Sequence, residues 1–217
     1  MTGLAAGTFA ITPATITITP TASQSIIYGA SDPAAGFGYS NTGLVNGVTP
    51  SYWNSSGSYV AASQINDTLS GKLGRAAGEN VGTYNYAIGS VVVSDPSNYN
   101  TLSLTAGTFA ITPATITVTP TASQSVVYGM SDPVAGFGYS SSGYVTGITP
   151  NYWNSSGTYV AASQINDSNT TSGKLGRAVG ENVGTYAYNI GSVVTNNSNY
   201  VTGLAAGDVL TYFSRRT

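Results

Sequence analysis

The chain has 217 residues, of which 41% are hydrophobic and only 6% are charged, and its formal net charge is −2. Because an average soluble protein carries about 25% charged residues, neutral polar side chains must cover most of this surface, and the few scattered Lys and Arg residues argue against nucleic acid and anionic membranes as partners. Cysteine and histidine are both absent, which excludes disulfides and removes the commonest general base and metal ligand.

The sequence is an internal repeat. Residues 7–99 return almost unchanged at residues 107–200. A unit of this length can hold a hydrophobic core of its own. We therefore predict three parts: residues 1–12 as the closing strand of a preceding repeat, residues 13–112 as a first module and residues 113–217 as a second module.

The first part has no module of its own in this chain. Residues 1–7 match residues 201–207 except at the first position, so we expect the chain to begin inside a repeat of a longer array. We predict that residues 8–11, which equal residues 108–111, either stay unpaired or add to a sheet edge of another chain and cause head-to-tail association. No run reaches the ~18 apolar residues of a membrane helix, so we expect no membrane insertion.

Alternating patterns predict strands in both modules. Thr and Ile alternate through residues 14–19, which places Ile16 and Ile18 on one face. In residues 81–88 the copies exchange Asn and Ala on one side only, as a solvated face allows. The core-facing residues predicted in the first module are Ile16, Ile18, Tyr84, Tyr86, Ile88 and Phe109.

Clusters of Gly, Pro, Asn, Asp and Ser separate these runs at short intervals, and we interpret Asp32 and Asp132, each followed by Pro, as turn residues. Short strands with regular turns favour an all-β fold of two tandem antiparallel Ig-like β-sandwich modules. Pro113 fixes its own φ and extends the residue before it, so the joint should be short and stiff and the pair should form an elongated rod.

Several segments resemble one domain family. They are residues 28–33 and 128–133 (YGASDP and YGMSDP), 43–47 (GLVNG), 70–84 (SGKLGRAAGENVGTY) and the closure from 97–99 to 111–113. Together they resemble the MBG domain of the YGX type, which is similar to the YDG domain, over most of both modules. The resemblance implies a repeat array in a secreted or surface-anchored bacterial protein, often a haemagglutinin-like adhesin, with stalk or adhesive modules and no catalytic residues.

The chain departs from that family at an insertion, residues 50–69 and 150–171, which is rich in aromatic residues. We weigh three interpretations of its Trp: a side chain that fills the sandwich core, which we favour; a platform that stacks on a sugar; and a contact between modules. The ligand-binding interpretation, with host or community glycans or surface proteins as partners, involves Tyr52, Trp53, Asn54, Tyr59 and their copies Tyr152, Trp153, Asn154 and Tyr159.

Each module repeats one short segment that carries a Lys, an Arg and a Glu. A Lys near a carboxylate and an Asn permits an isopeptide cross-link, although an exposed hairpin end with an ion pair worth about 0–1 kcal/mol is the favoured interpretation. The residues concerned are Lys72, Glu79 and Asn80, with the copies Lys174, Glu181 and Asn182. Asn66 and Asp67 lack the dense Asp spacing of a calcium loop, so no metal site is expected.

The sequence therefore predicts a protein that is not an enzyme and needs no cofactor. We expect a structural stalk module of a bacterial cell-surface adhesin, located outside the cell, which projects a distal adhesive region and contacts neighbouring repeats of the same protein. The alternative is an adhesive module that binds glycan or protein through the Trp53 and Trp153 loops.

Overall fold

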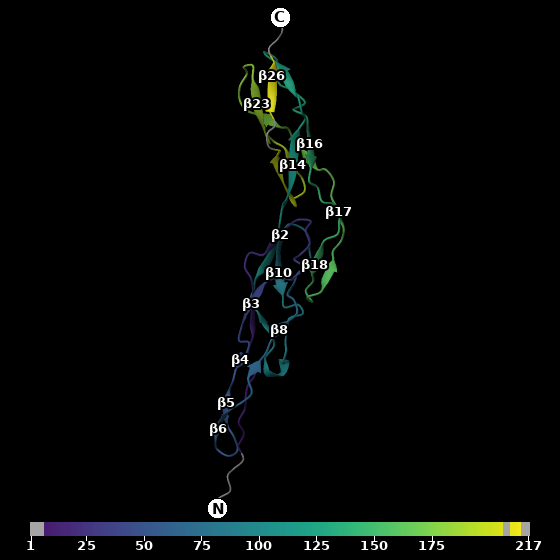
Figure 1. Cartoon of the computed structure of the whole chain (residues 1–217). Helices are drawn as coiled ribbons and strands as arrows, with labels where there is room; N and C mark the ends of the chain where they lie inside the picture. The colour runs from purple at the N-terminus through teal and green to yellow at the C-terminus, as the bar shows by residue number, and fades with distance from the viewer. Residues whose placement is uncertain (1–6, 206–208, 214–217) are drawn as a thin grey trace, which may run out of the picture.

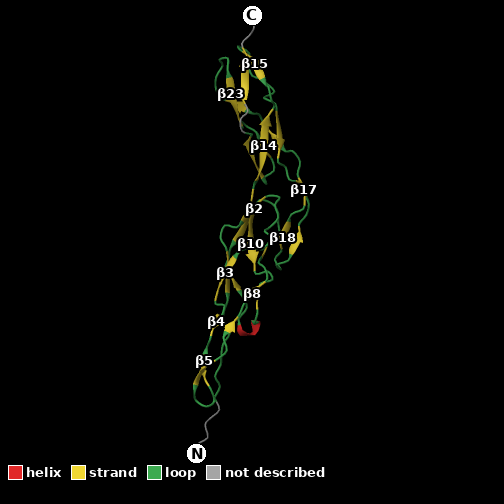
Figure 2. Cartoon of the chain, in the orientation of Figure 1, coloured by secondary structure: helices red, strands yellow, loops and turns green. Residues whose placement is uncertain are grey.

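A computed structural model describes residues 7–205 and 209–213, together with the side chains of residues 7–205. The chain forms a long, narrow rod in which the two modules follow one another (Figure 1). Its strands are short and are joined by extended loops (Figure 2). None of the described helical structure has the length and hydrophobicity that a membrane-spanning helix requires.

The first module contains thirteen strands and one short 3-10 helix. They are β1 (Thr17–Pro20), β2 (Ser25–Ile27), β3 (Tyr39–Thr42), β4 (Asn46–Val48), β5 (Ser51–Trp53), β6 (Tyr59–Ala61), β7 (Ile65–Asn66), β8 (Leu69–Ser70), β9 (Gly74–Arg75), β10 (Gly82–Ala87), β11 (Val92–Val93), η1 (Pro96–Asn98), β12 (Ser103–Leu104) and β13 (Thr108–Thr112).

The second module repeats this order. Its described strands are β14 (Ala114–Pro120), β15 (Ser125–Val127), β16 (Tyr139–Ser142), β17 (Thr146–Ile148), β18 (Asn151–Trp153), β19 (Tyr159–Ala161), β20 (Ile165–Asn166), β21 (Thr171–Ser172), β22 (Gly176–Arg177), β23 (Thr185–Asn189), β24 (Val194–Thr195), β25 (Tyr200–Leu204) and β26 (Val209–Phe213).

Two sheets enclose the core of the first module, in the orders β12-β1-β3 and β2-β13-β10-β9. Ile18 of β1, Ile16 just before it, and Tyr86 and Phe109 of the other sheet are buried in one cluster. Their burial confirms the core-facing positions predicted from the alternating pattern. Tyr84 and Ile88 are half-buried and pack against the same cluster.

The all-β prediction is confirmed, and most strand pairs are antiparallel. Each module also has two parallel pairs that the prediction did not include: β1 with β12 and β2 with β13 in the first module, and β14 with β25 and β15 with β26 in the second. A parallel pair needs a long connection. Most of a module lies between the two strands of each parallel pair, so no local sequence pattern predicts the pairing.

The joint between the modules is short. β13 belongs to the sheets of the first module and ends at Thr112, while β14 belongs to those of the second and begins at Ala114. The equivalent residues 7–12 form no strand, and Phe9 and Ile11 are 92% and 89% exposed. Among the described residues no strand pairs with this segment, and most of the surface of both side chains faces solvent.

The insertion forms an antiparallel hairpin in each module. In the first insertion hairpin (residues 50–62) β5 pairs with β6, and in the second (residues 150–162) β18 pairs with β19. The first extends beyond one end of the rod, whereas the second turns back and lies beside the first module (Figure 1). One sequence motif therefore occupies two different environments.

Candidate functional site at the junction of the modules

The second insertion hairpin is held rigid by local interactions. Trp153 and Tyr159 face each other across the strand pair, and their ring centroids are 5.0 Å apart. The Asn154 side chain organises the turn, because its Oδ1 accepts hydrogen bonds from the backbone N–H groups of Ser156 at 3.0 Å and Thr158 at 3.1 Å. The first hairpin has the same rings and the same Asn54 turn. The hairpin thus adopts one shape with or without a neighbouring module.

The second hairpin binds the loop around Asp32 in the first module. The indole Nε1–H of Trp153 donates to the carbonyl of Pro33 at 2.9 Å, and its backbone N–H donates to Oδ2 of Asp32 at 3.0 Å. The hydroxyl of Tyr159 donates to the Asp32 carbonyl at 2.9 Å. The backbone N–H of Asp32 also donates to the Asn151 carbonyl at 2.8 Å. These bonds fix the position of the hairpin on the first module.

A buried ion pair lies beneath this contact. Nε–H of Arg75 donates to both carboxylate oxygens of Asp32, at 3.1 and 2.8 Å, and both side chains are fully buried. The Tyr152 ring from the second module lies 5.0 Å from the guanidinium carbon, a distance at which aromatic rings attract cations. The hairpin therefore helps to shield the ion pair from water.

Glu79 is the second anion of this cluster. Nη2–H of Arg75 donates to Oε1 of Glu79 at 2.9 Å. Burial raises the pKa of Glu79, and the neighbouring Arg75 cation opposes that shift. The pKa of Arg75 is raised, because hydrogen bonds with Asp32 and Glu79 and their negative charges outweigh the burial that would lower it. Arg75 is thus charged and held by two carboxylates.

A second contact comes from Tyr28, the Tyr of the YGASDP segment. Its hydroxyl donates to Oδ2 of Asp167 in the second module at 2.9 Å, and Tyr200 donates to the same oxygen at 2.7 Å. The Tyr28 and Tyr200 rings meet edge to face with centroids 5.4 Å apart. Burial, then the hydrogen bond to Asp167 and its charge, raises the pKa of Tyr28 from 10.0 to about 12. Tyr28 therefore belongs to a site that both modules build.

The next residue, Gly29, is required at this contact for two reasons. Its φ of +88° lies in the left-handed region, which favours glycine. A Cβ at this position would also lie 2.7 Å from Cγ1 of Val145 in the second module. The Tyr-Gly pair of the motif thus supplies a side chain that enters the other module and a backbone that permits the approach.

A third contact involves Asn199. Its Nδ2–H donates to Oδ1 of Asn80 at 3.0 Å, and its Oδ1 accepts from the backbone N–H of Val81 at 2.8 Å. With the hairpin and the Tyr28 site, it joins the modules at several points besides the covalent connection. The junction is therefore a built interface and not a bare linker.

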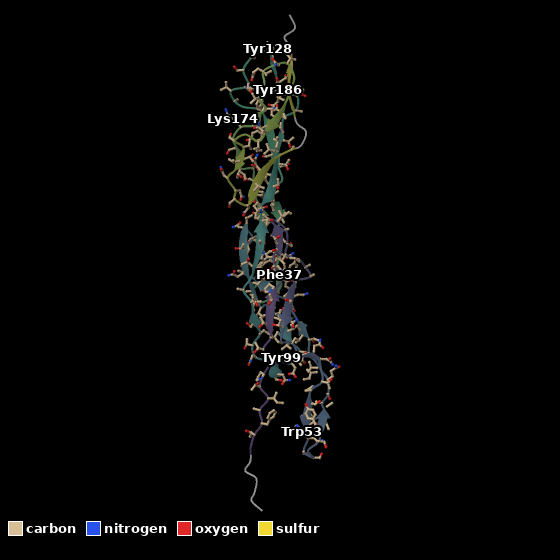
Figure 3. All side chains as sticks on the ribbon, turned by 90° about the vertical axis from the view of Figure 1, so that its left-hand side faces the viewer. Phe37, Trp53, Tyr99, Tyr128, Lys174 and Tyr186 are labelled. Carbon is tan, nitrogen blue, oxygen red and sulfur yellow. The ribbon has the colours of Figure 1, made fainter. Side chains whose placement is uncertain are left out.

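The copies of these residues at the ends of the rod are exposed. Trp53 is 71% and Tyr59 63% exposed, and Tyr128 is 56% exposed against 6% for Tyr28. Figure 3 places Trp53 and Tyr99 toward one end of the chain and Tyr128 at the other. The chain thus contains one assembled junction and, at its two ends, the separate halves of another.

The structure decides between the interpretations of the Trp. The favoured one, a side chain inside the sandwich core, is wrong: Trp53 is on the surface, and the partly buried Trp153 lies against the other module. The reason is that the insertion forms a separate hairpin that leaves its own module. Tyr52, Asn54 and Tyr59 share the exposed first hairpin, and Tyr152, Asn154 and Tyr159 the second. Sugar stacking by Trp53 stays a prediction.

The residues proposed for a cross-link have other partners. Lys72 donates to the carbonyl of Ala35, and Lys174 to that of Val134 at 2.7 Å. Glu181 pairs with Arg177 at 2.9 Å, as Glu79 does with Arg75. Within the described residues, no hydrogen bond or ion pair joins Lys72 to Glu79 or Asn80, or Lys174 to Glu181 or Asn182. The arginines provide the ion pairs.

Asp32, Arg75 and Tyr28 are junction residues that the sequence patterns do not predict. Asp32, which the sequence predicts to be a turn residue, binds Arg75, a residue 43 positions away. The available signal was that Asp and Arg, in a chain with 6% charged residues, recur at matching positions in both modules.

Comparison with known proteins gives one positive result. The family model of the MBG domain (YGX type) matches residues 16–110. The matched segment holds Tyr28, Asp32 and Arg75, that is, the first module's side of the junction. No curated protein and no solved structure matches the chain.

Proposed function

We propose that this chain, whose first module belongs to the MBG domain family (YGX type), is a rod-forming repeat segment of a bacterial cell-surface adhesin. In this proposal it lies outside the cell, contacts neighbouring repeats and holds a distal adhesive region away from the surface. The role is mechanical and needs no catalytic group. One observation carries the proposal: the second insertion hairpin binds the first module at Asp32.

This contact supports a stiff rod for a geometric reason. Modules joined by a linker alone are expected to move relative to one another. Here the connection at Pro113 is supplemented by the hairpin contact at Asp32 and by the Tyr28 site. Several separate attachment points restrict bending about the connection, which a stalk requires.

The strand order also suits a load along the rod. β13 lies between β2 and β10 and leads directly into the second module. A pull on Thr112 therefore acts on hydrogen bonds to two neighbouring strands together. Unfolding the module from this end requires that many of these bonds break at the same time.

The proposal is tested by the distance distribution between the modules. Because the chain has no cysteine, spin labels can be attached to the exposed equivalent positions Asn85→Cys and Ala187→Cys. We expect a narrow distribution in electron double resonance experiments. The double variant Trp153→Ala/Tyr159→Phe should broaden it, because it removes two hydrogen bonds and the indole from the junction.

The matched control is Trp53→Ala/Tyr59→Phe, the same change in the hairpin that lies outside the junction. We expect this control to leave the distribution unchanged. A broad distribution in the unmodified chain, or equal broadening by both double variants, would contradict a stiff junction and the stalk function based on it.

A second candidate function rests on the exposure of the first hairpin. Trp53 and Tyr59 form an exposed aromatic pair with ring centroids 5.2 Å apart, a surface on which a glycan or partner protein can stack. A change in Trp53 fluorescence on titration with oligosaccharides would support it. The candidate ranks second because the same surface in the second hairpin is occupied by the first module.

A further inference from the structure

We infer that the two ends of this chain are complementary halves of its internal junction and that a second copy of the chain docks on them end to end. This interaction between separate molecules goes beyond the proposed stalk role. The partner is argued from the junction itself, in which near-identical surfaces already bind each other.

The N-terminal face, defined as the first insertion hairpin and the pocket around Asp67, corresponds to the second module's side of the junction. A cavity of about 420 Å³ is lined by Val45, Ile65, Asp67 and Tyr99, together with residues 11–14, Ser97 and Asn98. In the second module Asp167 and Tyr200, the counterparts of Asp67 and Tyr99, receive Tyr28.

The hydrogen bonds around this cavity are the same as those around Asp167 and Tyr200, where Tyr28 is bound. Tyr99 donates to Oδ2 of Asp67 at 2.8 Å, as Tyr200 does to Oδ2 of Asp167 at 2.7 Å. The Tyr99 oxygen accepts from the backbone N–H of Val45 at 3.0 Å, as in the second module. A tyrosine hydroxyl that enters here finds the same carboxylate oxygen that Tyr28 uses, without rearrangement of the side chains.

The C-terminal face, defined as Tyr128, Asp132, Pro133 and Arg177, corresponds to the first module's side. Arg177 Nε donates to Asp132 at 2.7 Å, which repeats the arrangement of Arg75 and Asp32. The Asp132 side chain is 34% exposed, whereas that of Asp32 is fully buried under the hairpin. A cavity of about 420 Å³ is lined by Pro133 and Gly176. The equivalent residues of the first module, Pro33 and Gly74, contact Trp153 and Asn154 of the second hairpin.

Tyr128 is the counterpart of Tyr28, and its surroundings are open. Gly129 has a φ of +83°, close to that of Gly29, but a Cβ there would have no atom within 4 Å. At Gly29 that space is filled by Val145. The C-terminal face thus keeps the backbone geometry of the junction and has room for the valine of another copy, Val45.

The differences between the two copies do not obstruct docking. Three alanines of the first module are replaced by larger apolar residues in the second, and in the assembled junction the alanines are exposed to solvent. The pairs are Ala30 and Met130, Ala34 and Val134, and Ala77 and Val179. Ala77 lines a cavity of about 360 Å³ together with Tyr152 and Ile165 of the second module, which leaves space at the equivalent place for the larger Val179. The low net charge of −2 also keeps repulsion between copies small.

Residues 7–12 of the incoming copy have to move aside. In the junction the equivalent residues are β13, which continues into β14. In the docked pair the position of β13 is taken by β26 of the copy that offers its C-terminal face. This strand already lies between β15 and β23 of its own module. Residues 7–12 form no strand, and Phe9 and Ile11 are exposed, so their displacement breaks no strand pairing.

The test is sedimentation of the full chain over a range of concentrations. Within the chain, the covalent connection supplies an effective concentration of about millimolar. Separate copies should therefore associate between about 10 µM and 1 mM. Trp53→Ala on one face and Tyr128→Ala on the other should each weaken association at least about tenfold. Both side chains are largely exposed, so neither change should prevent folding.

Mixing the two variants separates end-to-end docking from other modes. Each variant retains one intact face, so the mixture should form 1:1 pairs and nothing larger, while each variant alone stays monomeric. A chain that starts at Pro13 should associate at least as well as the full chain, because the displaced segment is gone.

Four results would overturn the inference: a monomeric chain at 1 mM; association that neither substitution weakens; no pairing in the mixture; or loss of association on deletion of residues 1–12, which would mean that this segment connects the copies. A monomer whose Trp53 fluorescence responds to oligosaccharides would instead assign the hairpin to glycan. None of these outcomes alters the distance distribution within one chain, so failure here is distinguishable from failure of the stalk proposal.

Discussion

The substitution Asp32→Asn tests the buried ion pair under the hairpin. It keeps the size of the side chain but removes the charge that Arg75 contacts at 2.8 Å. Breaking a fully buried pair costs about 3–5 kcal/mol, and we expect the lower end, about 3 kcal/mol, because Glu79 still binds Arg75 at 2.9 Å. The matched change Asp132→Asn, at a side chain that is 34% exposed, should cost about 1 kcal/mol or less.

The assay is unfolding in urea, followed by hydrogen exchange of peptides from each module, which gives a free energy of unfolding for each. Asp32→Asn should lower the stability of the first module and loosen the second insertion hairpin, since Trp153 loses a charged acceptor. Asp132→Asn should affect the second module only slightly. Equal losses from the two changes would refute the reasoning, because they would mean that coverage by the hairpin does not strengthen the pair.

Three further predictions concern the junction and the core. Gly29→Ala should destabilise the junction by about 1–3 kcal/mol more than Gly129→Ala. Both substitutions place a Cβ at a residue with positive φ, but only the Cβ at position 29 contacts Val145. The urea midpoints of the two variants measure this difference, and equal midpoints would contradict it. The pKa of Tyr28 is raised from 10.0 to about 12, so its contribution to the stability of the fold is fully present below pH 10 and is lost as the pH rises through about 12. Tyr28→Phe should therefore reduce the alkaline loss of stability in a pH series. It should not abolish that loss, since burial also raises the pKa of Tyr86 to about 12. Phe109→Ala, at a fully buried ring, should cost about 3–5 kcal/mol in chemical denaturation, and a loss below 1 kcal/mol would show that the core is elsewhere.

Much of the fold could be predicted because its signals are local. The alternation of Thr and Ile gives the period of a strand whatever surrounds it, and Ile16 and Ile18 are buried as that period requires. The parallel pairs could not be predicted in this way. β1 and β12 are separated by most of the module, and their alignment depends on the packing of everything between them.

The candidate site shows the same limit. Tyr28 and Asp32 carry no sign of their partners in the neighbouring sequence, because Asp167 lies in the other module and Arg75 lies 43 positions away. The repetition of these residues marks them as important. It does not say which atoms they bind.

The sequence by itself determined the all-β class, the duplication and the inward faces of the main strands, since these follow from composition and period. Only the tertiary structure decided where each insertion hairpin lies. Trp53 and Trp153 stand in nearly identical sequences, yet one is exposed and the other rests against Pro33. Identical local sequence cannot encode that difference, which arises because one hairpin in this chain has a folded module beside it and the other does not.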